Sequence, residues 1–104
     1  MLAELDIIPI GGAGASLSAL LAPVAKLVDE SGLDYRVGAM GTVVEGEWDR
    51  VMALAKRCHE AVLANVDRVI TTIRIDDRTD RPGPGRIVQK VRSLEAKAGK
   101  PLKT

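Results

Sequence analysis

The segment from Met40 to Trp48, MGTVVEGEW, concentrates side chains that could bind a small molecule. Thr42 offers a hydroxyl and Glu45 a carboxylate, while Met40 and Trp48 add a thioether and the only indole of the chain. Small-molecule sites typically combine a few converging polar groups with apolar or aromatic walls. Trp48 also begins an apolar helical stripe, so the sequence leaves open whether it caps the core or lines a pocket.

The glycine-rich stretch GGAGA at positions 11–15 is a second candidate site. Glycines between a strand and a helix let backbone N–H groups approach an anion at the helix N-terminus. The stretch lacks the lysine of a P-loop, and Leu17 stands where a dinucleotide-binding loop has its third glycine. We interpret it as a plain flexible connection that can flank a ligand, with a nucleotide site as the alternative.

Catalytic and metal-binding groups are scarce. Cys58 and His59 are neighbours on a predicted helix, where adjacent side chains point about 100° apart and cannot act as a nucleophile and its base. One histidine and one cysteine do not supply a zinc cluster. The sequence therefore predicts a protein that is not an enzyme, with no catalytic residue, no metal and no cofactor.

Composition narrows the class of protein further. A chain of 104 residues with 46% hydrophobic and 28% charged residues predicts one folded domain, residues 1–104. A net charge of +1 and only two aromatic residues argue against nucleic-acid binding. A single cysteine favours a reducing, cytoplasmic setting.

Residues 7–25 carry no charge and resemble a membrane segment or a signal sequence at first sight. Glu4 and Asp6 precede this run, which is the wrong polarity for export, and prolines and glycines interrupt it. We predict a strand, a glycine loop and a helix, without membrane insertion.

The first half of the chain has clear periodicities. Residues 2–9 alternate apolar and acidic side chains, as in a strand with one buried face. A helix follows, capped by Ser16 or Ser18 and ended near Gly32, and Pro23 should kink it. Its apolar stripe consists of Leu17, Leu20, Leu21, Val24, Leu27 and Val28.

The second half continues with two short strands, LDYRVGAM and TVVEG, for which we predict a turn with positive φ at Gly41. A helix from Glu47 to about Asn65 and a strand over residues 67–76 follow. The chain closes with a charged loop and a helix that carries Ile87, Val91 and Leu94.

This order, βαββαβ plus a C-terminal helix, predicts an α+β, ferredoxin-like antiparallel sheet with two helices on one face. The other face would carry Ile8, Ile70 and Thr72 among charged residues, which favours self-association. Glu4, Asp6 and Arg74 share that face. They form either solvated cross-strand ion pairs or a polar patch in an interface or pocket.

The segments AMGTVVEGEWDRVM, KRCHEAV and RVITTIRIDDR resemble the thiamine-binding protein family, as do LAELDIIPIG, SGLDY and GRIVQKVRSLE. The resemblance spans nearly the whole chain in order. It implies a ferredoxin-like fold and homo-oligomers, commonly dimers or tetramers, built by sheet packing. It also implies non-catalytic binding of thiamine or its hydroxymethylpyrimidine moiety, in thiamine uptake or salvage, sometimes beside transporter components.

Thiamine joins an aminopyrimidine to a cationic thiazolium, so a site needs hydrogen-bonding partners and an apolar wall. On the resemblance, Glu45 would pair with the aminopyrimidine or balance the cation, and Gly41 and Thr42 would supply hydrogen bonds. Met40 or Trp48 would pack on a ring. The remaining candidate ligand-binding residues are Ile10, Gly11 and Ser16 in the first loop and Thr72 on the fourth strand. The alternative is an oligomeric interaction or regulatory module without a ligand of its own.

Overall fold

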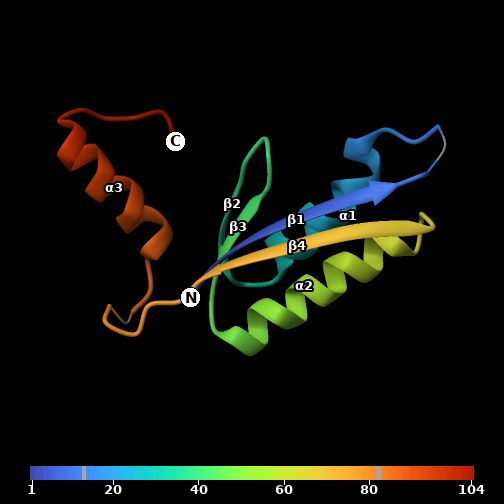
Figure 1. The fold of residues 1–104 in the computed structure, drawn as a ribbon, viewed down its shortest axis with the longest axis horizontal. Helices are drawn as coiled ribbons and strands as arrows, with labels where there is room; N and C mark the ends of the chain where they lie inside the picture. The colour runs from blue at the N-terminus through green and yellow to red at the C-terminus, as the bar shows by residue number, and fades with distance from the viewer. Residues whose placement is uncertain (13, 82) are drawn as a thin grey trace.

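The computed structural model describes residues 1–12, 14–81 and 83–104 (Figure 1). Part of the glycine-rich loop and part of the charged loop before the last helix, at positions 13 and 82, therefore lie outside the described residues. The elements, in chain order, are β1 (Leu2–Ile10), α1 (Leu17–Glu30), β2 (Asp34–Val37), β3 (Thr42–Glu45), α2 (Trp48–Leu63), β4 (Arg68–Asp76) and α3 (Arg86–Ala98).

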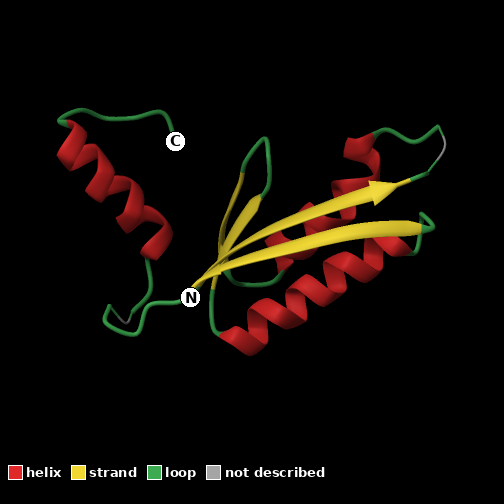
Figure 2. Cartoon of the chain, in the orientation of Figure 1, coloured by secondary structure: helices red, strands yellow, loops and turns green. Residues whose placement is uncertain are grey.

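The strands form one antiparallel sheet in the order β2-β3-β1-β4 (Figure 2). The long strands β1 and β4 pair along their whole lengths, from Leu2 opposite Asp76 to Ile10 opposite Arg68. The ferredoxin-like fold predicted from the sequence is confirmed, with the predicted C-terminal helix added to it.

One face of the sheet carries the core because its inward-facing side chains are apolar. Ala3, Leu5 and Ile7 of β1 and Val44 of β3 pack against α1 and α2. The two helices contribute fully buried side chains, namely Val28 from α1 and Val51, Cys58 and Val62 from α2. We name the opposite side, which these helices leave uncovered, the open face.

Helix α1 begins as predicted. Ser16 Oγ accepts a hydrogen bond of 3.2 Å from the N–H of Ala19, which satisfies one of the free donors at the helix start. Gly32 follows the helix with a φ of 78°, the left-handed conformation that glycine adopts most easily. Pro23 lies within α1, which continues past it as one helix.

The connection between β2 and β3 corrects one prediction. Gly41 does not have a positive φ. The turn is closed instead by a hydrogen bond of 2.9 Å from the N–H of Gly38 to the carbonyl of Gly41. Position 41 requires glycine for a steric reason, because a methyl group there would lie only 2.1 Å from Oδ1 of Asp6.

Helix α3 stands apart from the other helices (Figure 1). Among the described residues, β3 is the one element that it contacts appreciably. Of the apolar residues that this helix carries, Ile87 and Val91 are only half-buried, and Leu94 is exposed. An apolar stripe on this helix is therefore left largely without partners among the described residues.

Candidate ligand-binding site

The nine ligand-binding residues predicted from the sequence do not meet at one place. Glu45 lies opposite Leu2, at one end of the sheet, whereas Ile10 lies at the far end of β1. Eight residues of extended strand separate these ends, which corresponds to about 26 Å. Gly11 and Ser16 follow Ile10 at the far end, so the first loop and Glu45 cannot hold the same small ligand.

Glu45 has a structural task in this arrangement. Its buried carboxylate accepts hydrogen bonds from the N–H of Gly85, at 2.7 Å, and of Ile87, at 3.0 Å. Both donors belong to the start of α3, where backbone N–H groups are free and the helix dipole favours a negative charge. Glu45 therefore caps α3 across 40 residues of sequence.

The two apolar side chains of the segment 40–48 are on the surface. Trp48 is 53% exposed at the start of α2, so the interpretation that it caps the core is wrong. Helix α2 buries its stripe from Val51 onward. Met40 is almost fully exposed in the turn between β2 and β3.

The polar residues at the middle of the sheet divide between its two faces. Thr42 lies opposite Leu5, so it shares the covered face with the core. Thr72 lies opposite Asp6 and is exposed on the open face. Asp6 also lies against Gly41. We name Asp6, Gly41 and Thr72 together the open-face seat.

Asp6 is the unusual member of the open-face seat. Its Oδ1 atom is buried and has no hydrogen-bond partner among the described residues. A buried carboxylate oxygen without a donor is costly, and each such atom in a native protein requires an explanation. A ligand that donates a hydrogen bond to the carboxylate, once it turns toward the open face, would remove the cost.

The neighbours of the open-face seat differ on its two sides. On one side, Arg74 Nη2 lies 3.5 Å from Oε1 of Glu4, so the cross-strand ion pair expected from the sequence is present and largely solvated. On the other side, Ile8 and Ile70 oppose each other and are 53% and 42% exposed. The seat therefore joins a polar rim to an apolar surface on which a flat ring can lie.

A cleft of about 540 Å³ lies beyond Glu45, at the end of the sheet. Its walls include the carboxylates of Asp34, Glu45 and Glu47 and the guanidinium of Arg50, which donates a hydrogen bond of 3.2 Å to the carbonyl of Ser31. Its volume lies within the range of small-molecule sites. It is a second place where a cationic ligand finds carboxylates.

The remaining reactive side chains point away from both places. Cys58 is fully buried in the core, as predicted, and its burial raises the pKa of the thiol, which makes the thiolate scarce. His59 lies at the margin of the core, where Nδ1 is 2.6 Å from Oγ1 of Thr71 on the covered face. Among residues 1–12, 14–81 and 83–104, no group of three or more metal-ligating side chains comes together.

Comparison with known proteins identifies the family. Residues 3–95 match the model of the family described as thiamine-binding protein. The chain belongs to the thiamine-binding protein family. The resemblance noted in the sequence is thereby confirmed.

Relatives of this thiamine-binding family member occur in bacteria and archaea. A UPF0045 protein of Synechocystis is 38% identical over 96 residues, which are 91% of this chain and 77% of the relative. A UPF0045 protein of Methanothermobacter thermautotrophicus is 44% identical over 80 residues, covering 75% of this chain and 81% of the relative. These names assign no activity.

Solved structures of other proteins share the fold. A hypothetical protein of Methanocaldococcus jannaschii superposes with a TM-score of 0.80 at 35% identity, over 89% of this chain and 93% of the other. A Thermotoga maritima protein, provisionally described as a thiamine biosynthesis/salvage protein, gives a TM-score of 0.75 at 22% identity, over 89% and 96% of the chains. The latter similarity supports the fold alone. In this chain, none of the helices described is long and apolar enough to cross a membrane.

In the sequence, Asp6 resembles Glu4, its neighbour on the same face of the first strand, and nothing local distinguishes the two. The strand register distinguishes Asp6 from Glu4, because only the pairing of β1 with β3 and β4 places Asp6 between Gly41 and Thr72. The net charge of +1 also does not show that basic and acidic residues are unevenly distributed along the chain. Residues 78–104 contain eight basic and two acidic residues, whereas residues 1–77 contain seven basic and twelve acidic ones.

Proposed function

We propose that this protein binds thiamine or its hydroxymethylpyrimidine moiety at the open-face seat and does not transform it chemically. The observation that supports this proposal best is the buried Oδ1 of Asp6, which has no donor among the described residues. The exocyclic amine of the aminopyrimidine is a hydrogen-bond donor of the kind that a carboxylate oxygen accepts. Family membership makes this ligand class the first to test.

The surroundings of Asp6 suit the rest of the ligand. The pyrimidine ring would lie on Ile8 and Ile70, which present apolar surface beside the seat. The hydroxyl of Thr72, exposed on the same face, can donate to a ring nitrogen or accept from the amine. Gly41 lets the carboxylate of Asp6 lie close to the backbone of the turn, because a methyl group at position 41 would lie 2.1 Å from Oδ1.

The proposal of binding without catalysis is supported by what faces the open-face seat. Cys58 is buried on the covered side, and His59 contacts Thr71 on that same side. Neither side chain reaches the seat, and within the described open-face seat Asp6 is the one titratable side chain beside Gly41 and Thr72. A role in uptake or salvage, in the cytoplasm and beside a transporter component, would need binding alone.

The binding proposal is tested by calorimetry on the full chain. Thiamine and hydroxymethylpyrimidine are expected to bind, whereas the analogue that carries oxygen in place of the exocyclic amine binds much more weakly because Asp6 loses its donor. The matched analogue controls for ring stacking and for the thiazolium charge. Absence of heat with all three compounds at millimolar concentration would contradict the proposal and favour a regulatory module without a ligand.

We further propose that the open face packs against a second copy of the chain, with the ligand held between the two copies, giving a dimer or tetramer. Ile8 and Ile70 expose apolar surface at the centre of this face, and burial of such surface favours association. Light scattering is expected to give at least twice the 11.1 kDa of one chain. Ile70→Lys should lower that mass, whereas Leu63→Lys, at an equally exposed position on α2, should not. A monomeric wild type would contradict the packing.

A further inference from the structure

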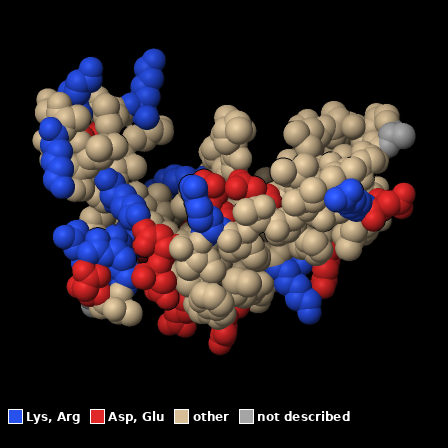
Figure 3. Space-filling model, viewed as in Figure 1, with Lys and Arg blue, Asp and Glu red and all other residues tan. Residues whose placement is uncertain are grey.

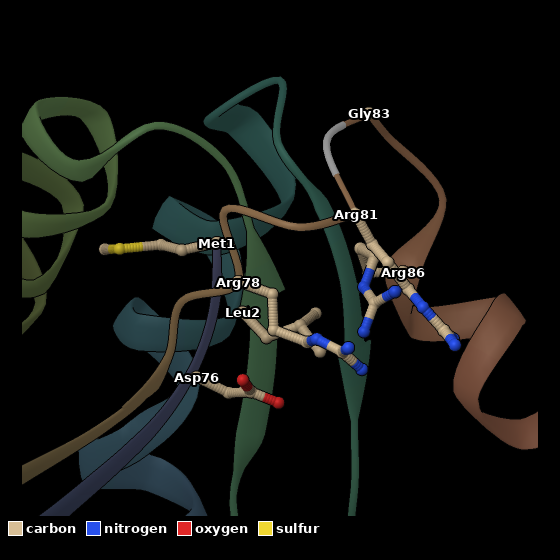
Figure 4. A pocket seen from close by; sticks show the side chains of 7 residues that line it. All are labelled: Met1, Leu2, Asp76, Arg78, Arg81, Gly83 and Arg86. Carbon is tan, nitrogen blue, oxygen red and sulfur yellow. The ribbon is translucent and has the colours of Figure 1, made fainter.

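A small cavity near the start of α3 is lined by three arginines. Arg78 and Arg81 come from the loop after β4, and Arg86 is the first residue of α3 (Figure 4). The cavity measures about 110 Å³, and Met1, Leu2, Asp76 and Gly83 complete its walls. We name it the arginine pocket.

Arg86 is the least ordinary of the three arginines because it is only 9% exposed. Its Nη1 donates a hydrogen bond of 3.1 Å to Oε1 of Gln89, which is a neutral acceptor. Among the described residues, no carboxylate lies within ion-pair distance of its guanidinium. The nearest carboxylate that acts on Arg86, that of Asp76, is already paired with Lys90, so the buried guanidinium is only partly compensated and this position favours a further anion.

The other charges around the arginine pocket are already matched. Arg78 forms a two-pronged ion pair with Asp80, with distances of 3.0 Å from Nε and 2.6 Å from Nη2. Asp76 pairs with Lys90, whose hydrogen bond lowers the pKa of that carboxyl. The nearby Glu45 is engaged by backbone donors of α3.

Arg81 and Arg86 therefore remain at the pocket without a carboxylate of their own, because Asp80 and Asp76, which act on them electrostatically, are already paired with Arg78 and Lys90. In the described part of the chain, neither has a carboxylate at ion-pair distance. Basic side chains also gather over α3 and the loop before it (Figure 3). A phosphate group carries about −1.5 to −2 charges at neutral pH, which matches this excess.

The volume of the pocket limits what it can hold. Sites for whole small molecules occupy about 300–1,000 Å³, whereas one water takes about 30 Å³ of liquid. At about 110 Å³, the cavity accommodates one compact group. Guanidinium groups recognise phosphate through paired N–H donors, better than they recognise a spherical anion.

We propose that the arginine pocket binds a phosphate group, held by Arg81 and Arg86 with Arg78 beside them. The group can belong to free inorganic phosphate or to a phosphate ester. Leu2 and Asp76 lie four residues along β1 and β4 from Asp6 and Thr72, on the same face. This corresponds to about 13 Å. A phosphorylated form of the pyrimidine ligand would then place its pyrimidine at the open-face seat and its phosphate at the arginine pocket. This ester alternative rests on the proposed function.

Calorimetry on the full chain tests the pocket with three probes at constant ionic strength: inorganic phosphate, thiamine and thiamine monophosphate. Inorganic phosphate should bind the wild type, and Arg81→Gln should weaken it about tenfold or more. Arg92→Gln removes the same charge from an exposed position on α3 and should change the affinity less than about twofold. Arg86→Gln, with its fold checked by circular dichroism, should act like Arg81→Gln.

The outcomes separate the two proposals. Phosphate binding without thiamine binding supports the arginine pocket and contradicts the open-face seat, and thiamine binding without any effect of phosphate does the reverse. If thiamine monophosphate binds more tightly than both thiamine and phosphate, and Arg81→Gln removes the gain, the ester is the ligand. Equal losses in Arg81→Gln and Arg92→Gln would overturn the pocket, because they would indicate a diffuse surface charge.

Discussion

Asp6→Asn is expected to weaken thiamine binding by about tenfold to a hundredfold while the fold remains intact. The substitution keeps the size of the side chain but replaces a negatively charged hydrogen-bond acceptor, the carboxylate, with a neutral amide. Hydrogen bonds to charged groups contribute about 1.5–3 kcal/mol, and 1.4 kcal/mol corresponds to a factor of ten in affinity. Calorimetric titration of the variant and the wild type with thiamine measures the loss.

Stability should move in the opposite direction or stay unchanged. In the unliganded chain, Oδ1 of Asp6 is buried without a partner among the described residues, which costs free energy of folding. Removing that charge therefore cannot destabilise the protein through a lost contact at this atom. Urea denaturation of Asp6→Asn should give a free energy of unfolding equal to or above that of the wild type.

Glu4→Gln is the matched control for Asp6→Asn. Glu4 lies on the same face of β1, but its carboxylate already has Arg74 as a largely solvated partner. Its loss should change thiamine affinity less than about threefold, since exposed ion pairs contribute little. Gly41→Ala tests the same seat by shape, because its methyl group would lie 2.1 Å from Asp6 Oδ1. Wild-type affinity in both Asp6→Asn and Gly41→Ala would remove the open-face seat from consideration.

Glu45→Ala is expected to release the start of α3 from the sheet. The substitution removes both hydrogen bonds that the carboxylate accepts, from Gly85 and from Ile87. Losing a cap costs about 0.5–2 kcal/mol, and bonds to a charged acceptor lie at the upper end of that range or above it. Since β3 is the main described partner of α3, little else opposes the opening of this helix.

Hydrogen exchange reports this opening directly. Amides in Arg86–Ala98 should exchange about 30-fold faster in Glu45→Ala, for a loss of about 2 kcal/mol, while those of β1 and β4 keep their protection. Glu47→Ala is the control, because Glu47 precedes α2 without making a side-chain cap bond and should leave exchange unchanged. Unchanged protection of α3 in Glu45→Ala would show that contacts outside this chain hold the helix in solution.

The two variants also distinguish two roles for the segment 40–48. Were Glu45 the acceptor for the pyrimidine, Glu45→Ala would abolish thiamine binding and Asp6→Asn would not. The geometry favours the opposite result. Both oxygens of Glu45 are occupied by backbone donors, whereas one oxygen of Asp6 has no donor.

The sequence by itself determined the elements, their order and the face that each strand buries. Ala3, Leu5 and Ile7 alternate with acidic residues, and Val51 and Cys58 recur at helical spacing, so the buried side follows from local periodicity. The helix cap at Ser16 and the left-handed Gly32 were equally readable, because both depend on residues a few positions away. Family resemblance supplied the ligand class to be tested, which periodicity does not contain.

Only the tertiary structure decided where the chemistry lies. Oδ1 of Asp6 is buried because the register of β1 places it against Gly41. The carboxylate of Glu45 is held by hydrogen bonds because α3 returns to the sheet 40 residues later. Arg86 became buried by the same return. Such contacts join residues far apart in sequence, and whether a polar group is satisfied depends on atoms within about 3 Å that no local pattern specifies.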